Sequence, residues 1–225
     1  MSLILSSFKQ GLKYAPHVLK DLSIYFAGYF FVFSFIVLWL FKFLSSADTF
    51  SPNILHTALL AIASLFTAFI VPYYAFKYSK GSVPKFWDFI RDNIWPLIFA
   101  YIKAFFVVLL FLILLILPGI YKGIRFSFLT ETVLFDKKAS KSMLKQADSN
   151  TRGYFWQIIL FLIVSGIFGF ILKMILKTTS VFLGSHMFII WINLILAFYI
   201  QCFVLLWKTH FFFEIKNKKG EEISC

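Results

Sequence analysis

Cysteine is scarce in this sequence. Two of the 225 residues are cysteines, Cys202 and Cys225. Their separation matches neither the spacing of a metal-binding motif nor that of a redox motif, and it gives no indication of a disulfide. We therefore expect both thiols to be structural or incidental.

Acidic residues and histidines are also few. The ten Asp and Glu are scattered along the chain and the four histidines are isolated from one another. His56 and His186 fall near the same predicted membrane face, but two histidines without cysteines or acids make a weak metal site. A Gly-rich phosphate loop and a G-x-S-x-G elbow are missing as well. The sequence predicts a non-enzymatic protein with no metal and no cofactor.

Polar surface is the third shortage. Charged residues make up 14% of the chain and hydrophobic residues 60%, with a mean hydropathy of +0.85. Polar residues are too few to cover the surface of a water-soluble globule. We therefore expect most of the chain to be surrounded by lipid. A bilayer admits helices or a closed barrel, and the continuous apolar runs exclude the alternating pattern of a barrel. We predict an all-α polytopic membrane protein, with residues 1–225 forming a single integral membrane domain.

Six apolar stretches are candidate transmembrane helices. They are Leu22 to Leu44, Ile54 to Phe76, Trp95 to Leu117, Gly119 to Phe135, Phe155 to Leu176 and Met187 to Trp207. Five of them are close to the roughly 20 residues that a core about 30 Å thick requires. The fourth is shorter and carries Lys122, Arg125 and Glu131, so by itself it also fits an amphipathic or re-entrant segment.

The positions of the basic residues favour six crossings. With six, most of the 22 Lys and Arg lie on one side, which the positive-inside rule makes cytoplasmic, together with both termini. Without the fourth crossing, a loop with five basic residues would be exported. The net charge of +12 then reflects topology and attraction to anionic headgroups, and no basic soluble domain indicates a nucleic-acid partner.

The two ends of the chain are predicted to lie outside the spans. Residues 1–20 are expected to form an interfacial helix, and residues 214–225 a polar cytoplasmic tail. The apolar residues of the first segment recur at helical spacing: Leu3, Ile4, Phe8 and Leu12. Pro16 should end or bend this helix before the first span, because proline removes a hydrogen-bond donor and clashes with the preceding turn.

Three ionisable residues at membrane depth are candidate functional groups. They are Lys103, Arg125 and Glu131. Each costs a few kcal/mol unless it is paired, hydrated or able to reach the interface. Lys103 and Glu131 lie at similar depths on adjacent antiparallel spans, which predicts an ion pair. The alternative is that Lys103 extends toward the interface while nearby hydroxyls satisfy Glu131.

One region carries a distinctive order of features. The run LPGIYKGIRFSFLTETVLF covers residues 117–135, and SMLKQADSNTRGYFW covers 142–156. Together they resemble the membrane-domain family of bacterial glycerophosphoryl diester phosphodiesterases and YciC-type integral membrane proteins. The matching positions include Pro118, Gly119, Arg125, Ser127, Thr151, Arg152, Gly153 and Trp156.

The resemblance implies a helical module of the bacterial inner membrane, with a short cytoplasmic helix between the fourth and fifth spans. No phosphodiesterase domain lies within these 225 residues, so we do not expect hydrolysis of glycerophosphodiesters. Pro118 and Gly119 are expected to form a tight outer hairpin. Arg152 is a candidate for holding lipid phosphates, with a purely structural anchor as the alternative.

These observations predict a non-enzymatic inner-membrane protein with a lipid- or envelope-associated role and anionic lipid headgroups as partners. The alternative is a small-solute transporter or channel. That alternative requires a set of polar residues to converge on a water-filled path: Lys103, Arg125, Glu131, Asn193 and Gln201.

Overall fold

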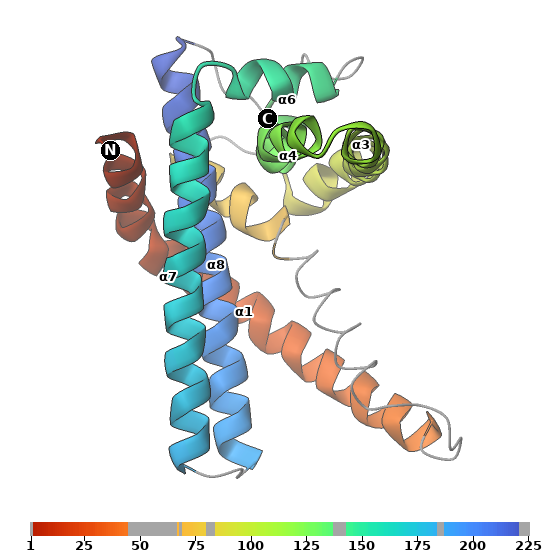
Figure 1. The fold of residues 1–225 in the computed structure, drawn as a ribbon. Coiled ribbons are helices and arrows are strands. Elements are labelled where there is room, and N and C mark those ends of the chain that lie inside the picture. The colour runs from red at the N-terminus through yellow and green to blue at the C-terminus, as the bar shows by residue number, and fades with distance from the viewer. Residues whose placement is uncertain are drawn as a thin grey trace.

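The computed structural model describes residues 2–44, 67, 69–79, 84–136, 143–183 and 187–220. Within these ranges the regular structure is helical and contains no strand, which confirms the all-α class. Most of the second predicted span lies outside the described residues, and so do His56, His186 and Cys225; of that span, residues 69–76 are helical. The described helices form an open arrangement rather than a single parallel bundle (Figure 1).

The first helix, α1, runs from Ser2 to Leu44 without interruption. It therefore joins the predicted interfacial helix to the first predicted span. Pro16 does not end it, although the helix changes direction along its length, which is typical of a helix containing proline (Figure 1). Its first half packs against α8, where the Phe8 ring lies 4.9 Å from the Trp207 ring, whereas Leu12 is 51% exposed.

The third and fourth helices form a hairpin. Helix α3 spans Phe86–Leu114 and α4 spans Ile116–Arg125. The chain reverses at Leu115, which is extended, and Pro118 lies in the first turn of α4. The predicted turn at Pro118 and Gly119 is thus displaced by three residues. Proline is tolerated in a first turn, because the N–H groups there have no partner within the helix.

The fourth predicted span is not one continuous helix. After α4 come a short 3-10 helix, η1, over Phe126–Phe128, and then α5 over Leu129–Phe135. All seven residues of α5 are buried inside the protein. The only helices in the described part that are long and apolar enough to cross a membrane are α3 and, over Phe155–Leu172, α7. These helices support a membrane protein, and the number of crossings stays a prediction.

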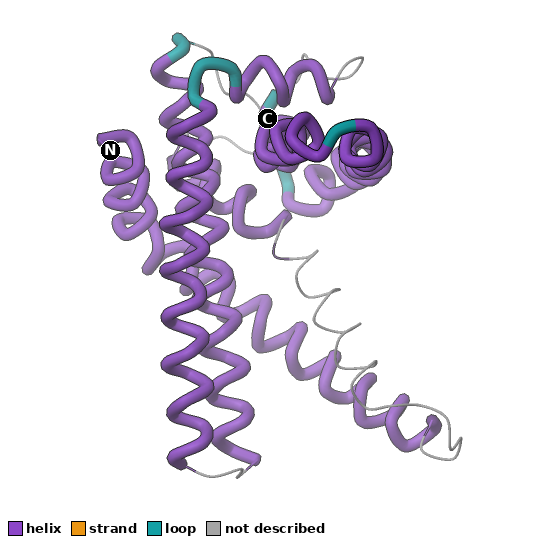
Figure 2. The backbone as a smooth tube through the Cα atoms, in the orientation of Figure 1, coloured by secondary structure: helices purple, strands orange, loops and turns teal. Residues whose placement is uncertain are grey.

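Helix α6, Met143–Thr151, is the short helix expected before the fifth span. A turn at Gly153, whose φ of +87° suits glycine, leads into α7, Phe155–Leu183. Helix α8, Met187–Lys218, lies side by side with α7 (Figures 1 and 2). It continues beyond Trp207, the end of the last predicted span, so residues 214–218 of the predicted tail are helical.

Helices α3 and α4 lie crosswise to α7 and α8. Figure 1 shows α7 and α8 along their length, whereas α4 and most of α3 are seen end-on. An aromatic core joins η1, the segment that follows α4, to α7 and α8. Phe128 of η1 stacks on Phe211 of α8 with ring centroids 5.8 Å apart, and Phe161 of α7 stacks on Phe211 at 4.4 Å. This core lies next to the charged groups described below.

Candidate functional site

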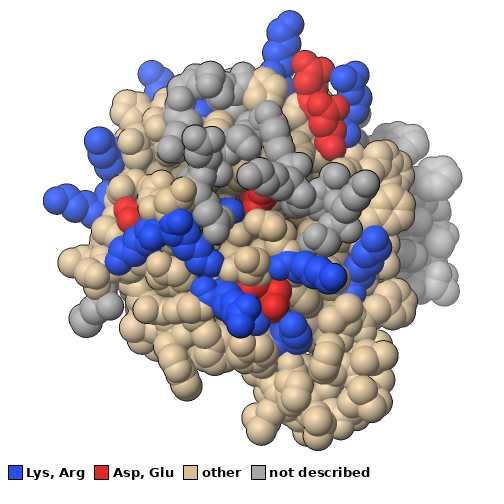
Figure 3. Space-filling model, turned by 90° about the horizontal axis from the view of Figure 1, so that it is seen from above, with Lys and Arg blue, Asp and Glu red and all other residues tan. Residues whose placement is uncertain are grey.

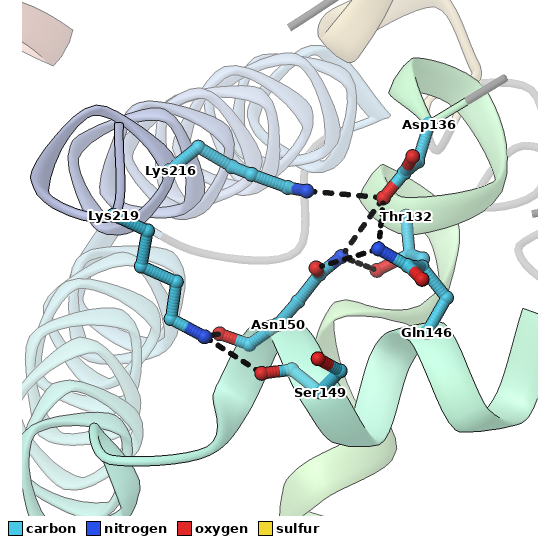
Figure 4. A network of polar contacts seen from close by, with 7 residues as sticks. All are labelled: Thr132, Asp136, Gln146, Ser149, Asn150, Lys216 and Lys219. Carbon is cyan, nitrogen blue, oxygen red and sulfur yellow. Dashed lines mark hydrogen bonds and ion pairs between the residues drawn. The ribbon is translucent and has the colours of Figure 1, made fainter. Parts of the chain in front are cut away.

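Asp136 is the centre of a polar network that joins three helices (Figure 4). It follows the last residue of α5, and its carboxylate accepts hydrogen bonds from Lys216 of α8 at 3.0 Å and from Gln146 of α6 at 2.9 Å. The side chains of Lys216 and Asp136 are 3% and 10% exposed. A buried ion pair of this kind is favourable when further hydrogen bonds satisfy its polar atoms. Here the Asp136 carboxylate also accepts the hydrogen bond from Gln146.

The same network holds the end of α6. Asn150 donates to Thr132 at 3.2 Å, and Lys219 donates to the backbone carbonyls of Ser149 at 2.6 Å and Asn150 at 2.9 Å (Figure 4). The last carbonyls of a helix lack partners within the helix, and a cation there also interacts favourably with the helix dipole. Lys219 therefore caps α6 and ties it to the end of α8.

Arg125 is paired with an aspartate of α6. Its guanidinium lies 2.8 Å from Asp148, and Lys122 lies 3.2 Å from the same carboxylate. The Arg125 side chain is 8% exposed and stacks over the Tyr121 ring at 5.1 Å. Its Nε is buried without a hydrogen-bond partner among the described residues. This arginine is therefore neutralised inside the protein and is not presented to a ligand at the surface.

Glu131 pairs with a different lysine from the one expected. Its Oε1 lies 3.2 Å from Lys208 of α8, and its side chain is 1% exposed. Lys103 is exposed on α3, so the predicted pair of Lys103 with Glu131 is wrong. Glu131 and Lys208 are 77 residues apart in the sequence, so local patterns do not indicate this pair. Only packing of α8 against η1 and α5 brings the two side chains together. Within the described part, the Oε2 atom of Glu131 has no partner.

A second set of polar contacts joins α1 to α8. The Trp207 indole donates to Ser7 at 3.1 Å, Gln10 donates to Glu214 at 3.0 Å, and Tyr14 stacks on His210 at 5.2 Å. His210 lies three residues beyond the last predicted span and is fully buried. Burial lowers the pKa of His210 to about 4, because a charged imidazole is disfavoured there. The interface between α1 and α8 therefore contains a neutral histidine at pH 7.

The residues singled out by the resemblance have different environments. Ser127 is half-buried, and its hydroxyl lacks a partner within the described ranges. Thr151 donates to the Ala147 carbonyl at 2.9 Å, which is an ordinary bond within a helix. Arg152 is exposed at the start of the turn, and Trp156 is 76% exposed on the first turn of α7.

Among the described residues, the two buried members of the set required for a solute path lie in different ion pairs. Lys103 is exposed on α3, whereas Arg125 and Glu131 are buried in two separate ion pairs. Gln201 is half-buried on α8, and the side chain of Asn193 is outside the described part. No group of three or more His, Cys, Asp and Glu side chains among the described residues is placed to hold a metal ion. Arg125 and Glu131 each join two helices through these pairs.

Basic side chains gather on the end of the molecule formed by α6 and the end of α8. Figure 3 shows this face, where Lys and Arg are numerous and Asp and Glu are few. Exposed members on these two helices and the following turn are Lys145, Arg152 and Lys218. The sequence pattern indicates Arg152 as a candidate, but it does not indicate Asp136, Asp148, Lys208 or Lys216. No local pattern marks those four, since each finds its partner on another helix.

Asp136→Asn is expected to destabilise the protein by about 3 kcal/mol, because it leaves the buried Lys216 ammonium without a counter-charge. Thermal unfolding of the detergent-solubilised protein measures the effect. Asp88→Asn is the matched control, because Asp88 is 51% exposed and pairs with Arg91 at 3.6 Å on the surface, where an ion pair contributes little. Equal effects of the two substitutions would contradict a structural role for the Asp136 network.

Comparison of the chain with protein-family models, with curated proteins and with solved structures finds no match in any of the three.

Proposed function

We propose that this chain is a non-enzymatic membrane protein whose α6 end faces the cytoplasm and binds anionic lipid headgroups. Support comes from the order of surfaces along α7. The side of α7 that faces away from the protein carries Ile163, Ile167 and Phe170, which are 51%, 54% and 64% exposed. Exposed Trp156 lies at the start of this apolar face, and exposed Arg152 precedes it. Apolar surface, tryptophan and arginine in this order are typical of a helix entering a bilayer.

Arg152 is the headgroup contact in this proposal. It is exposed and forms no ion pair within the described part of the chain, so its guanidinium is available for bidentate contact with a phosphate. Arg125 is excluded from this role by its contact with Asp148 at 2.8 Å. Trp156, next to the turn at Gly153, would lie at the level of the headgroups and set the depth of Arg152.

The finer topology in this proposal rests on the sequence. Cytoplasmic termini follow from the positions of the basic residues. Placement in a bacterial inner membrane, and membership of the YciC-type family, rest on the resemblance of residues 117–135 and 142–156. The count of six crossings also rests on the sequence. The positions of the basic residues allow four crossings as well, because α3 and α4 are consecutive. Removing them as a pair leaves every basic loop on the same side.

Arg152→Ala is expected to reduce retention of anionic lipid about fivefold, which corresponds to about 1 kcal/mol for one basic residue at the membrane surface. Native mass spectrometry of protein purified in mild detergent, with phosphatidylglycerol and phosphatidylethanolamine added in equal amounts, measures the selectivity. Arg91→Ala is the matched control, because Arg91 is 77% exposed but lies 3.6 Å from both Asp88 and Asp92. Unchanged selectivity in Arg152→Ala would overturn the proposal.

A further inference from the structure

An aromatic contact connects the α3–α4 hairpin with the cytoplasmic end of α7. Tyr121 of α4 and Phe155, the first residue of α7, have ring centroids 4.7 Å apart. With six crossings, Tyr121 would lie two residues from the outer end of the fourth span, whereas Phe155 begins the fifth span at its inner end. A hydrocarbon core about 30 Å thick would separate them. The contact and six crossings are therefore incompatible.

The ion pairs of α4 lead to the same conclusion. Lys122 and Arg125 both contact Asp148 of α6, at 3.2 Å and 2.8 Å. Helix α6 belongs to the basic segment that the positive-inside rule places in the cytoplasm. Helix α4 contains ten residues and is therefore about 15 Å long at 1.5 Å per residue. Measured from that cytoplasmic contact, α4 can reach about half of the core at most.

The orientation of the hairpin limits its depth further. In Figure 1, α4 and most of α3 are seen end-on, at the height of the first turns of α7. If α7 runs along the membrane normal, the hairpin extends sideways instead of toward the outer face. Its tip is apolar, and Leu114, Leu115, Ile116 and Leu117 are 66%, 65%, 68% and 80% exposed. In water such a tip would be an unprotected hydrophobic patch.

We propose that the α3–α4 hairpin does not cross the membrane but lies within the cytoplasmic leaflet, with its tip in contact with the acyl chains of that leaflet. Exposed Trp87 and Trp95, at the start of α3, lie at the headgroup level. Lys122 and Arg125 are tolerated near the hydrocarbon because they share the Asp148 carboxylate, and the one positive charge that remains lies beside the cytoplasmic helix α6. The loop with five basic residues stays in the cytoplasm, so the reason for counting a fourth crossing disappears.

This inference rests on the membrane placement proposed above, and cysteine accessibility tests the two separately. Leu115→Cys and Thr178→Cys are made in a Cys202→Ala, Cys225→Ser background. Intact cells are then treated with a membrane-impermeant maleimide. Thr178 is exposed near the end of α7, just beyond the fifth predicted span, and should be labelled from outside. Leu115 should show less than about a tenth of that labelling, because it lies in the opposite leaflet.

Each result decides one point. Labelling of Leu115→Cys from outside, comparable to that of Thr178→Cys, would show that the hairpin crosses and would overturn the inference. Failure to label Thr178→Cys in a correctly folded protein would instead overturn the placement of α7, and the inference with it. Low labelling of Leu115→Cys together with strong labelling of Thr178→Cys supports both proposals.

Cross-linking gives a second, positive readout. In the same cysteine background, Tyr121→Cys and Phe155→Cys are combined and treated with a short bifunctional maleimide in native membranes. The intramolecular product is expected in high yield, because the two native rings are in contact. Residues on opposite sides of a bilayer could not give it. Absence of the product from the membrane-embedded protein would overturn the inference.

Discussion

Glu131→Gln is expected to lower the free energy of unfolding by about 3 kcal/mol, the lower end of the range for a broken buried ion pair. Gln has nearly the same volume as Glu, so packing changes little and the loss is electrostatic. The Lys208 ammonium, 19% exposed, would lose the carboxylate that lies 3.2 Å away. Its partial exposure allows some contact with water, which limits the cost. Unfolding in mixed detergent micelles, monitored by circular dichroism, measures the change.

A double-mutant cycle identifies the partner of Glu131. Lys208→Met in the Glu131→Gln background should recover part of the lost stability, because no unpaired charge remains. Lys103→Met is the matched control, since Lys103 is exposed and forms no ion pair among the described residues. Rescue of Glu131→Gln by Lys103→Met, but not by Lys208→Met, would contradict the structure and support the pair expected from sequence.

Gly119→Ala is expected to destabilise the hairpin by about 1–3 kcal/mol, the usual cost of an overpacked contact. A Cβ atom at Gly119 would lie 2.5 Å from the Cγ and 2.8 Å from the Cα of Leu112. Both distances are shorter than real contacts. The Leu112 side chain can move, but its Cα cannot move without separating α3 from α4. The same unfolding measurement detects the loss.

Two variants separate this clash from a general effect of adding a methyl group to α4. At Gly123→Ala, the nearest neighbour of the new Cβ would be Val108 Cγ1 at 4.0 Å, which is an ordinary contact. That substitution should stabilise the protein by up to about 1 kcal/mol, because alanine favours a helix interior over glycine. Leu112→Ala should restore only part of the stability of Gly119→Ala, since the backbone contact persists. A neutral Gly119→Ala would indicate that the helices are farther apart.

The composition and the local patterns determined most of the secondary structure. Continuous apolar runs predicted helices without strands, and the described ranges agree. The short helix before the fifth span, which the resemblance implied, is present as α6, and the turn that follows it contains Gly153 with the positive φ that other residues disfavour. Helix boundaries were less accurate. Leu115, and not Pro118, reverses the chain, because proline fits the first turn of α4 and the extended residue comes before it.

Ion-pair partners could not be deduced from the sequence. Lys103 and Lys208 have the same charge, and predicted depth favoured Lys103, because Lys208 lies one residue beyond the last predicted span. The choice depends on which helix packs against Glu131, and contacts between helices distant in the chain determine that. Asp136 with Lys216, 80 residues apart, illustrates the same limit.

The sequence by itself determined that this is a helical, strongly apolar and basic protein, and it located Arg152 and Trp156 where an apolar helix begins. Only the tertiary structure decided that α1 packs along α8, that Arg125 is neutralised by Asp148, and that α4 lies beside the first turn of α7. The physical reason is that hydropathy and helix propensity act over a few neighbouring residues. Crossing geometry and charge pairing depend on side chains that meet only after the chain has folded.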